Sequence, residues 1–60
     1  MKSKLYEEAE AAEMLGISVY TLQGIRKAGL ISYIQISPRK IKYTLGQIEE
    51  YQLKNTRVAA

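Results

Sequence analysis

The chain has 60 residues, a formal net charge of +3 at pH 7, and neither cysteine nor histidine. A chain this short forms a single domain and buries only about 60% of the surface that its unfolded form exposes, so we expect no catalytic cleft and no enzyme. Without cysteine or histidine, disulfides and the usual zinc sites are excluded, and we expect neither a metal nor a cofactor.

The apolar stretches of the chain are short and interrupted. Glu7, Glu8, Glu10 and Glu13 fall where the hydrophobic region of a signal peptide would have to run. No segment approaches the roughly 20 apolar residues that are needed to span a bilayer. The sequence therefore predicts a soluble, cytoplasmic protein.

The charges are distributed unevenly. The stretch from Met14 to Ile48 contains no acidic residue, and its basic residues are Arg26, Lys27, Arg39, Lys40 and Lys42. A solvated surface explains many single basic clusters, but the separation of acids from bases predicts a positive face that suits nucleic acid.

The first elements are an arm and a helix. Residues 1–5, with Lys2 and Lys4, are expected to form a short arm that stays mobile unless a partner orders it. The first helix is expected to begin near Tyr6 or Glu7 and to end at Leu15, because glutamates in the opening turns suit the positive end of the helix dipole.

Residues 11–25 predict a helix, a three-residue turn and a second helix. In the turn Gly16-Ile17-Ser18, glycine permits the backbone that ends a helix, and Ser18 can cap the next helix by accepting a backbone N–H. The second helix should run from Ser18 to about Ala28 and stop at Gly29, after which Leu30 anchors the chain to the core. The apolar residues that pack the two helices are Ala11, Ala12, Leu15, Ile17, Leu22 and Ile25.

From Tyr33 to Tyr43 the apolar period changes to two, which predicts a short hairpin with its turn at residues 37–40. Thr44 is expected to cap a last helix of about ten residues, and residues 55–60 are expected to fray. The inward residues of the hairpin would be Ile34, Ile36, Ile41 and Tyr43, and those of the last helix Leu45, Ile48 and Tyr51 or Gln52.

This order of elements describes a winged helix-turn-helix, a mainly α domain in which a small antiparallel β-hairpin is the wing. Residues 11–18, Thr21-Leu22, Gly29-Leu30 and residues 39–43 resemble the excisionase-like and MerR-like family of small winged-helix DNA-binding proteins. The resemblance covers roughly residues 5–51. It implies an excision factor of a phage or mobile element, which bends DNA and assists an integrase, or a small transcription regulator.

The second helix is expected to enter the major groove of DNA. With Leu22 and Ile25 inward, the outward residues are Val19, Tyr20, Gln23, Gly24 and Lys27. Gln23 can read adenine, Tyr20 can reach a phosphate or a thymine methyl, and Lys27 can take a guanine or a phosphate. The hydroxyls of Ser18 and Thr21 suit phosphate, although Ser18 can also serve only as a cap.

The wing supplies the remaining candidates. Arg39 and Lys40 at its tip suit a minor groove or the phosphates beside it, and Lys42 suits phosphate. Arg26 is interpreted as a residue that interacts with the dipole of its own helix. The predicted DNA-binding residues are therefore Ser18, Tyr20, Thr21, Gln23, Lys27, Arg39, Lys40 and Lys42.

Two functions remain open. The first is a DNA-binding accessory protein, whose weak binding as a monomer improves through self-association on repeated sites or a larger partner. The second is an adaptor subunit of an integrase, polymerase or helicase that adds affinity for duplex or single-stranded DNA, favoured by Gly24 on the reading face and by five tyrosines. The first requires that the helix from Ser18 and the wing project the same way, with no glutamate between them.

Overall fold

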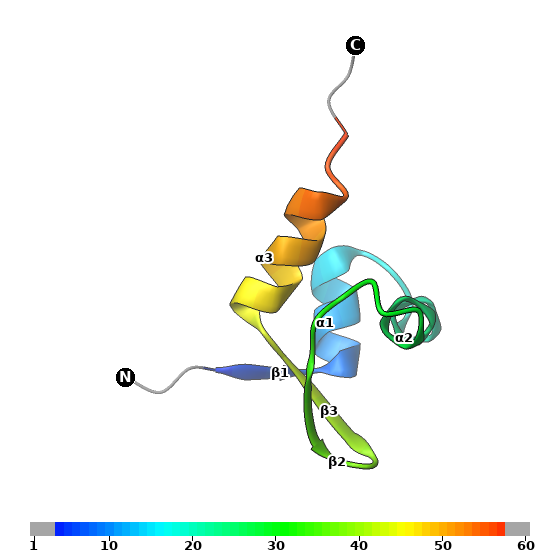
Figure 1. Cartoon of the computed structure of the whole chain (residues 1–60), viewed down its shortest axis with the longest axis vertical. Coiled ribbons are helices and arrows are strands. Elements are labelled where there is room, and N and C mark those ends of the chain that lie inside the picture. Colours follow the sequence, from blue (N-terminus) through cyan, green and yellow to red (C-terminus); the bar gives the residue numbers. More distant parts are fainter. Residues whose placement is uncertain (1–3, 58–60) are drawn as a thin grey trace.

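Three helices pack with a three-stranded antiparallel sheet in this computed structural model, which describes residues 4–57 (Figure 1). The strand order β1-β3-β2 places β3 in the middle. Figure 1 shows the β2–β3 hairpin extending away from the helices and α3 leaving in the opposite direction. The fold class is confirmed as a winged helix-turn-helix, with these elements: β1 (Leu5–Glu7), α1 (Glu8–Leu15), α2 (Val19–Lys27), β2 (Ile34–Ser37), β3 (Lys40–Thr44) and α3 (Leu45–Lys54).

Strand β1 corrects the prediction of an arm over residues 1–5. Leu5 pairs with Thr44 and Tyr6 with Tyr43, so Leu5 belongs to the sheet and α1 begins only at Glu8. A strand of three residues is too short to show a period of two, and its existence depends on a partner distant in the sequence. Residues 1–3, which include Lys2 of the predicted arm, lie outside the described residues.

The helix-turn-helix is confirmed at the level of its hydrogen bonds. Gly16 has a φ of 73° and closes α1 through its N–H, which donates to the Glu13 carbonyl at 3.0 Å. The Ser18 Oγ accepts the Thr21 N–H at 3.1 Å, which satisfies a donor at the start of α2. Gly29 follows α2 with a φ of 75°, as a left-handed helix stop requires.

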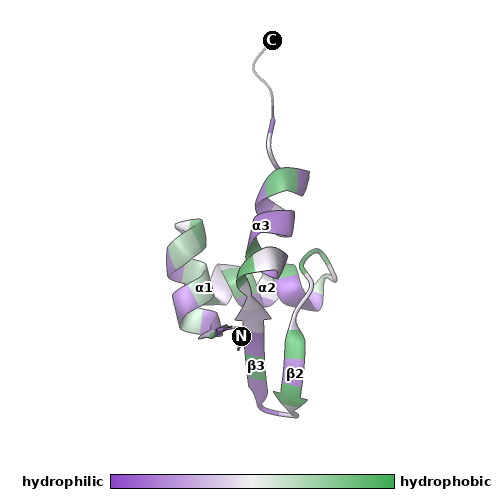
Figure 2. Cartoon of the chain, turned by 90° about the vertical axis from the view of Figure 1, so that its left-hand side faces the viewer, coloured by the Kyte–Doolittle hydropathy of each residue, from purple (hydrophilic) through white to green (hydrophobic). Residues whose placement is uncertain are grey.

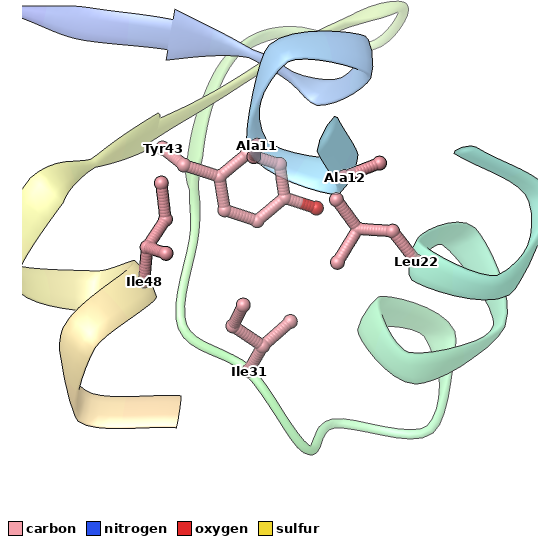
Figure 3. Close-up of a cluster of buried hydrophobic side chains, with 6 residues drawn as sticks. All are labelled: Ala11, Ala12, Leu22, Ile31, Tyr43 and Ile48. Carbon is pink, nitrogen blue, oxygen red and sulfur yellow. The ribbon is translucent and has the colours of Figure 1, made fainter. Parts of the chain in front are cut away.

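The core gathers around Tyr43. Figure 3 shows its ring between Ile48 and Leu22, and the remaining buried members are Ala11, Ala12 and Ile31. Ile31 takes the anchoring position predicted for Leu30, which is 61% exposed. The Leu30 N–H still donates to the Ile25 carbonyl, so Leu30 belongs to the turn that closes α2 and the chain meets the core one residue later.

The register of the hairpin corrects its predicted inner face. Ile34 pairs with Lys42 and Gln35 with Ile41, and directly paired residues point to the same face of a sheet. Ile34 therefore lies on the face opposite to Tyr43, which is one residue from Lys42. Ile36 falls in an irregularity between Gln35 and Ser37 and is 52% exposed. Figure 2 shows the alternation of apolar and polar residues along both strands, which does not by itself fix their relative phase.

Helix α3 starts at the predicted cap. The Thr44 Oγ1 accepts the Gln47 N–H at 3.1 Å, and the Gln47 Oε1 accepts the Thr44 N–H at 3.0 Å. The helix has the predicted ten residues, but Leu45 is exposed, and the first buried residue of the helix is Ile48. Of the two alternatives for its second inner position, Tyr51 is the residue that packs against the core, and Gln52 is exposed.

The residues after α3 continue its hydrogen bonding for one turn. The Asn55 Nδ2 donates to the Tyr51 carbonyl at 2.8 Å, and the Thr56 hydroxyl donates to the Gln52 carbonyl at 2.7 Å. Residues 58–60 of the tail that is predicted to fray lie outside the described residues. Within residues 4–57, no helix has the length and apolar character needed to cross a membrane.

Candidate nucleic-acid interface

Helix α2 and the wing border a common hollow of about 600 Å³. The wing is defined here as β2, β3 and the turn between them, residues 34–44. Figure 1 shows the wing extending beyond α1 and α2. The hollow is lined by Gln23 and Arg26 from α2, by Gln35 and residues 38–42 from the wing, and by Glu7, Glu8 and Ala9. The expectation that α2 and the wing face the same space therefore agrees with the structure.

Two glutamates enter this space, contrary to expectation. Strand β1 sets Glu7 directly across from Lys42, and the Lys42 Nζ lies 3.2 Å from a Glu7 carboxylate oxygen. The Arg26 Nε lies 2.8 Å from the Glu8 Oε2. Among the described residues that line the hollow, Arg39 and Lys40 are the cations outside these two ion pairs. The condition set from the sequence, that no glutamate lies between α2 and the wing, is therefore not met. Each of the two carboxylates is paired with a cation, so the remaining positive charge of the hollow is concentrated at the wing tip, on Arg39 and Lys40.

Glu8 connects three elements of the domain. Its Oε2 accepts hydrogen bonds from the Arg26 Nε of α2 at 2.8 Å and from the Tyr43 hydroxyl of β3 at 2.7 Å. The side chains of Glu8 and Arg26 are only 15% and 18% exposed. The Arg26 guanidinium also lies 5.6 Å from the centre of the Tyr33 ring, within the range of a cation–π contact. This Glu8 cluster, defined as Glu8, Arg26 and Tyr43, fixes α2 relative to the base of the wing.

The protonation states of the Glu8 cluster support one another. Burial by itself would raise the pKa of Glu8, but hydrogen bonds from Arg26 and Tyr43 and the charge of Arg26 outweigh it and lower the pKa below 4.5. Burial, followed by the hydrogen bond to Glu8, raises the pKa of Tyr43. The hydrogen bond to Glu8 raises the pKa of Arg26. At neutral pH the cluster therefore holds an anion, a cation and a neutral phenol.

The predicted DNA-binding residues fall into two groups. Gln23, Arg39, Lys40 and Lys42 line the hollow, whereas Tyr20, Thr21 and Lys27 on α2 and Ser18 at its N-cap lie outside it. Tyr20 is 79% exposed, and Lys27 is exposed in the last turn of α2. The hydroxyls of Ser18 and Thr21 lie 2.9 Å apart, so the capping role of Ser18 is confirmed. Both hydroxyl residues remain exposed to solvent.

Val19 was predicted to face outward from the second helix, and the structure contradicts this prediction. It is half-buried and packs against the core. The cause is helical geometry, because Val19 precedes the buried Leu22 by three residues and therefore shares its face.

The sequence interpretation missed the role of the Glu8 cluster. The prediction for Arg26 was an interaction with the dipole of α2, whereas the structure gives it a carboxylate partner on α1. The only signal in the sequence was a pair of adjacent glutamates, Glu7 and Glu8, at the start of the first helix, where a small capping residue is more usual. That signal does not name a partner on another element.

The comparison with known families agrees with this architecture. The family described as "Helix-turn-helix domain" matches residues 5–56, which extend from β1 past the end of α3. The chain belongs to this family. It is a small DNA-binding protein of the helix-turn-helix type. Comparisons with curated proteins and with solved structures found no match.

Proposed function

We propose that the protein binds duplex DNA as an excisionase-like accessory factor of a phage or other mobile element, acting in excision or in transcription regulation. The proposal is carried by one observation, the shared hollow between α2 and the tip of the wing. A strand of DNA that passes there contacts α2 on one side and Arg39 and Lys40 on the other. The protein would act in the cytoplasm and would not itself catalyse a reaction.

Helix α2 would supply the contacts to bases. Gln23 lies at the edge of the hollow, where its amide can form two hydrogen bonds with an adenine. Tyr20 and Lys27 extend from the exposed face of α2 to a thymine methyl, a guanine or a phosphate. The Ser18–Thr21 hydroxyl pair at the start of α2 suits a phosphate oxygen.

The wing would supply most of the electrostatic attraction. Arg39 and Lys40 are placed for the phosphates or the minor groove beside the major groove that α2 enters. Lys42 must exchange the Glu7 carboxylate for a phosphate, which weakens its contribution. We therefore propose that one copy binds weakly and that self-association on repeated sites, or a larger recombination protein, raises the affinity.

The experiment is a measurement of duplex affinity across a range of salt concentrations, using sequences that the protein selects from random duplexes. Each phosphate contact contributes about 0.9 to the slope of log affinity against log salt, so R39A/K40A together should reduce that slope by about 2. The matched control is Lys54→Ala, because Lys54 lies on α3 and pairs with Glu50 outside the hollow. The absence of duplex binding at low salt, or an unchanged slope in the double variant, contradicts the proposal.

A second candidate function is an adaptor subunit of an integrase, polymerase or helicase. The observation that favours it is the exposure of Leu45 and Leu53 on α3, at 47% and 76%, on an element that contributes nothing to the lining of the hollow. The two functions are separated by testing whether the original chain and the L45S/L53S variant each copurify with such an enzyme encoded nearby. A stable complex that the double variant disrupts, with little affinity for duplex DNA, favours the adaptor. Preference for single strands is measured by repeating the affinity measurement described above with single-stranded DNA of the same sequence.

A further inference from the structure

Gly24 lies on the exposed face of α2, and nothing in the folded chain requires a glycine there. Its backbone is ordinary right-handed helix, unlike Gly16 and Gly29, whose φ angles of 73° and 75° favour glycine. A Cβ atom placed at Gly24 would meet no atom within 4 Å. Glycine in the interior of an exposed helix is destabilising relative to alanine. The fold therefore loses stability at this position without gaining a turn or a close internal contact.

The neighbours of Gly24 turn the missing side chain into a notch. Residues three and four positions away are its neighbours on a helix surface, and these are Tyr20 and Thr21 before it and Lys27 and Ala28 after it. All four are exposed, and within residues 4–57 Tyr20 is the most exposed of the large apolar residues, at 79%. The notch is therefore a bare stretch of helix backbone, with Tyr20 before it and Lys27 after it on the same helix surface.

We propose that the notch at Gly24 receives the edge of a base pair, so that the backbone of α2 lies directly against the floor of the major groove. The inference rests on the proposed function and adds how α2 approaches the DNA. A helix with its side chains is 10–12 Å across and the major groove is about 12 Å wide, so the side chain that faces the groove floor sets the depth of insertion.

Close approach also compensates for the small number of side chains on the exposed face of α2 that can contact bases. The side chains that flank the notch include the hydroxyl of Thr21 and the amine of Lys27, and deeper insertion brings both within reach of base edges. Any side chain at position 24 would hold these groups away from the groove. The same change would make the free protein more stable, so stability and binding respond in opposite directions.

The experiment compares Gly24→Ala and Gly24→Leu with the original chain on a duplex that the original chain selects from a random pool. Gly24→Ala should raise Tm by about 4 °C, because alanine favours the helix and meets open space. It should also weaken duplex binding about tenfold, and Gly24→Leu should weaken it further. The salt slope should stay unchanged in both variants, since no phosphate contact is lost.

The matched control is Gly46→Ala in α3, where the added Cβ meets only the Thr44 Oγ1, at an ordinary contact distance of 3.9 Å. It should leave duplex affinity unchanged. Equal or tighter binding by the Gly24 variants overturns the inference while leaving the proposed function intact. If the original chain selects no duplex, the proposed function itself fails, and this inference fails with it. A loss of affinity accompanied by a lower Tm also overturns it, because the variant would then have damaged the fold.

Discussion

The two elements that border the hollow are held in place in different ways. Helix α2 is fixed by the buried Leu22, by the Ser18 cap and by the ion pair from Arg26 to Glu8. The wing is anchored at its base, where Tyr43 is buried and pairs with β1, and at Ile41, which packs against the core. Beyond the end of β1, the wing has only its own two strands and carries the exposed Ile36. Substitutions in the anchored region should therefore mainly change the stability of the fold, and substitutions toward the wing tip should mainly change the affinity for duplex DNA.

The largest expected effect is a loss of stability from a substitution in α2, the firmly anchored element. Leu22→Ala removes a fully buried side chain between α1 and α2 and should lower the free energy of unfolding by about 3 kcal/mol. Urea unfolding followed by circular dichroism measures the change. Leu53→Ala, at a leucine that is 76% exposed, should change stability by less than about 0.5 kcal/mol. Similar losses in the two variants would contradict the assignment of the core.

The Glu8 cluster should show the next largest effect. Glu8→Gln leaves Arg26 and Tyr43 without their carboxylate acceptor and should lower the free energy of unfolding by about 1 to 2 kcal/mol at pH 7. Because the cluster orients α2 relative to the wing, duplex affinity should fall as well. Glu13→Gln, at an exposed glutamate of the same helix, is the control and should change neither quantity.

The Glu8 cluster also predicts a dependence of stability on pH. The folded pKa of Glu8 lies below the unfolded value, so its ionisation contributes stability that is present above about pH 4.5 and is lost as the pH falls through the folded pKa. Unfolding measured at pH 7 and at pH 3 should show a smaller acid-induced loss for Glu8→Gln than for the original chain. An equal loss in both chains would assign the acid sensitivity to other carboxylates.

A smaller effect is expected inside the hollow, and it has the opposite sign. Glu7 is 65% exposed, so its ion pair with Lys42 contributes little stability, and Glu7→Gln should change the free energy of unfolding by less than about 0.5 kcal/mol. The variant removes the competition of Glu7 for Lys42, so duplex affinity should rise and the salt slope should increase by up to about 0.9. Unchanged affinity would mean that Lys42 does not reach the DNA.

The smallest effect on stability is expected on the outer part of the wing. Ile36→Ser should change the free energy of unfolding by less than about 0.5 kcal/mol, since Ile36 is more than half exposed and outside the regular pairing. Ile41→Ser, at a residue that packs against the core, should cost at least about 1 kcal/mol. Thermal unfolding of the two variants compares these losses of stability directly. A larger loss for Ile36→Ser than for Ile41→Ser would support the inner face that was predicted from the alternation of residues.

Local chemistry in the sequence determined the helix-turn-helix and the last helix. The ends of these helices depend on single residues and their immediate neighbours, namely Gly16, Ser18, Gly29 and Thr44, and the structure confirms each of them. Of the predicted site residues, those of the wing and Gln23 meet in one hollow, as the resemblance to winged helix-turn-helix proteins implied, but that meeting is a property of the folded chain. The helix ends, by contrast, require no knowledge of distant contacts.

Only the tertiary structure decided which residues meet across elements. Strand β1 exists because β3 offers it a partner, and that pairing carries Glu7 to Lys42 and positions Glu8 beside Arg26 and Tyr43. The register between β2 and β3 likewise turned Ile34 away from the core face, and the irregularity beside it left Ile36 exposed. Pairing and register depend on contacts between residues far apart in the chain, whereas periodicity reports only spacing along one segment.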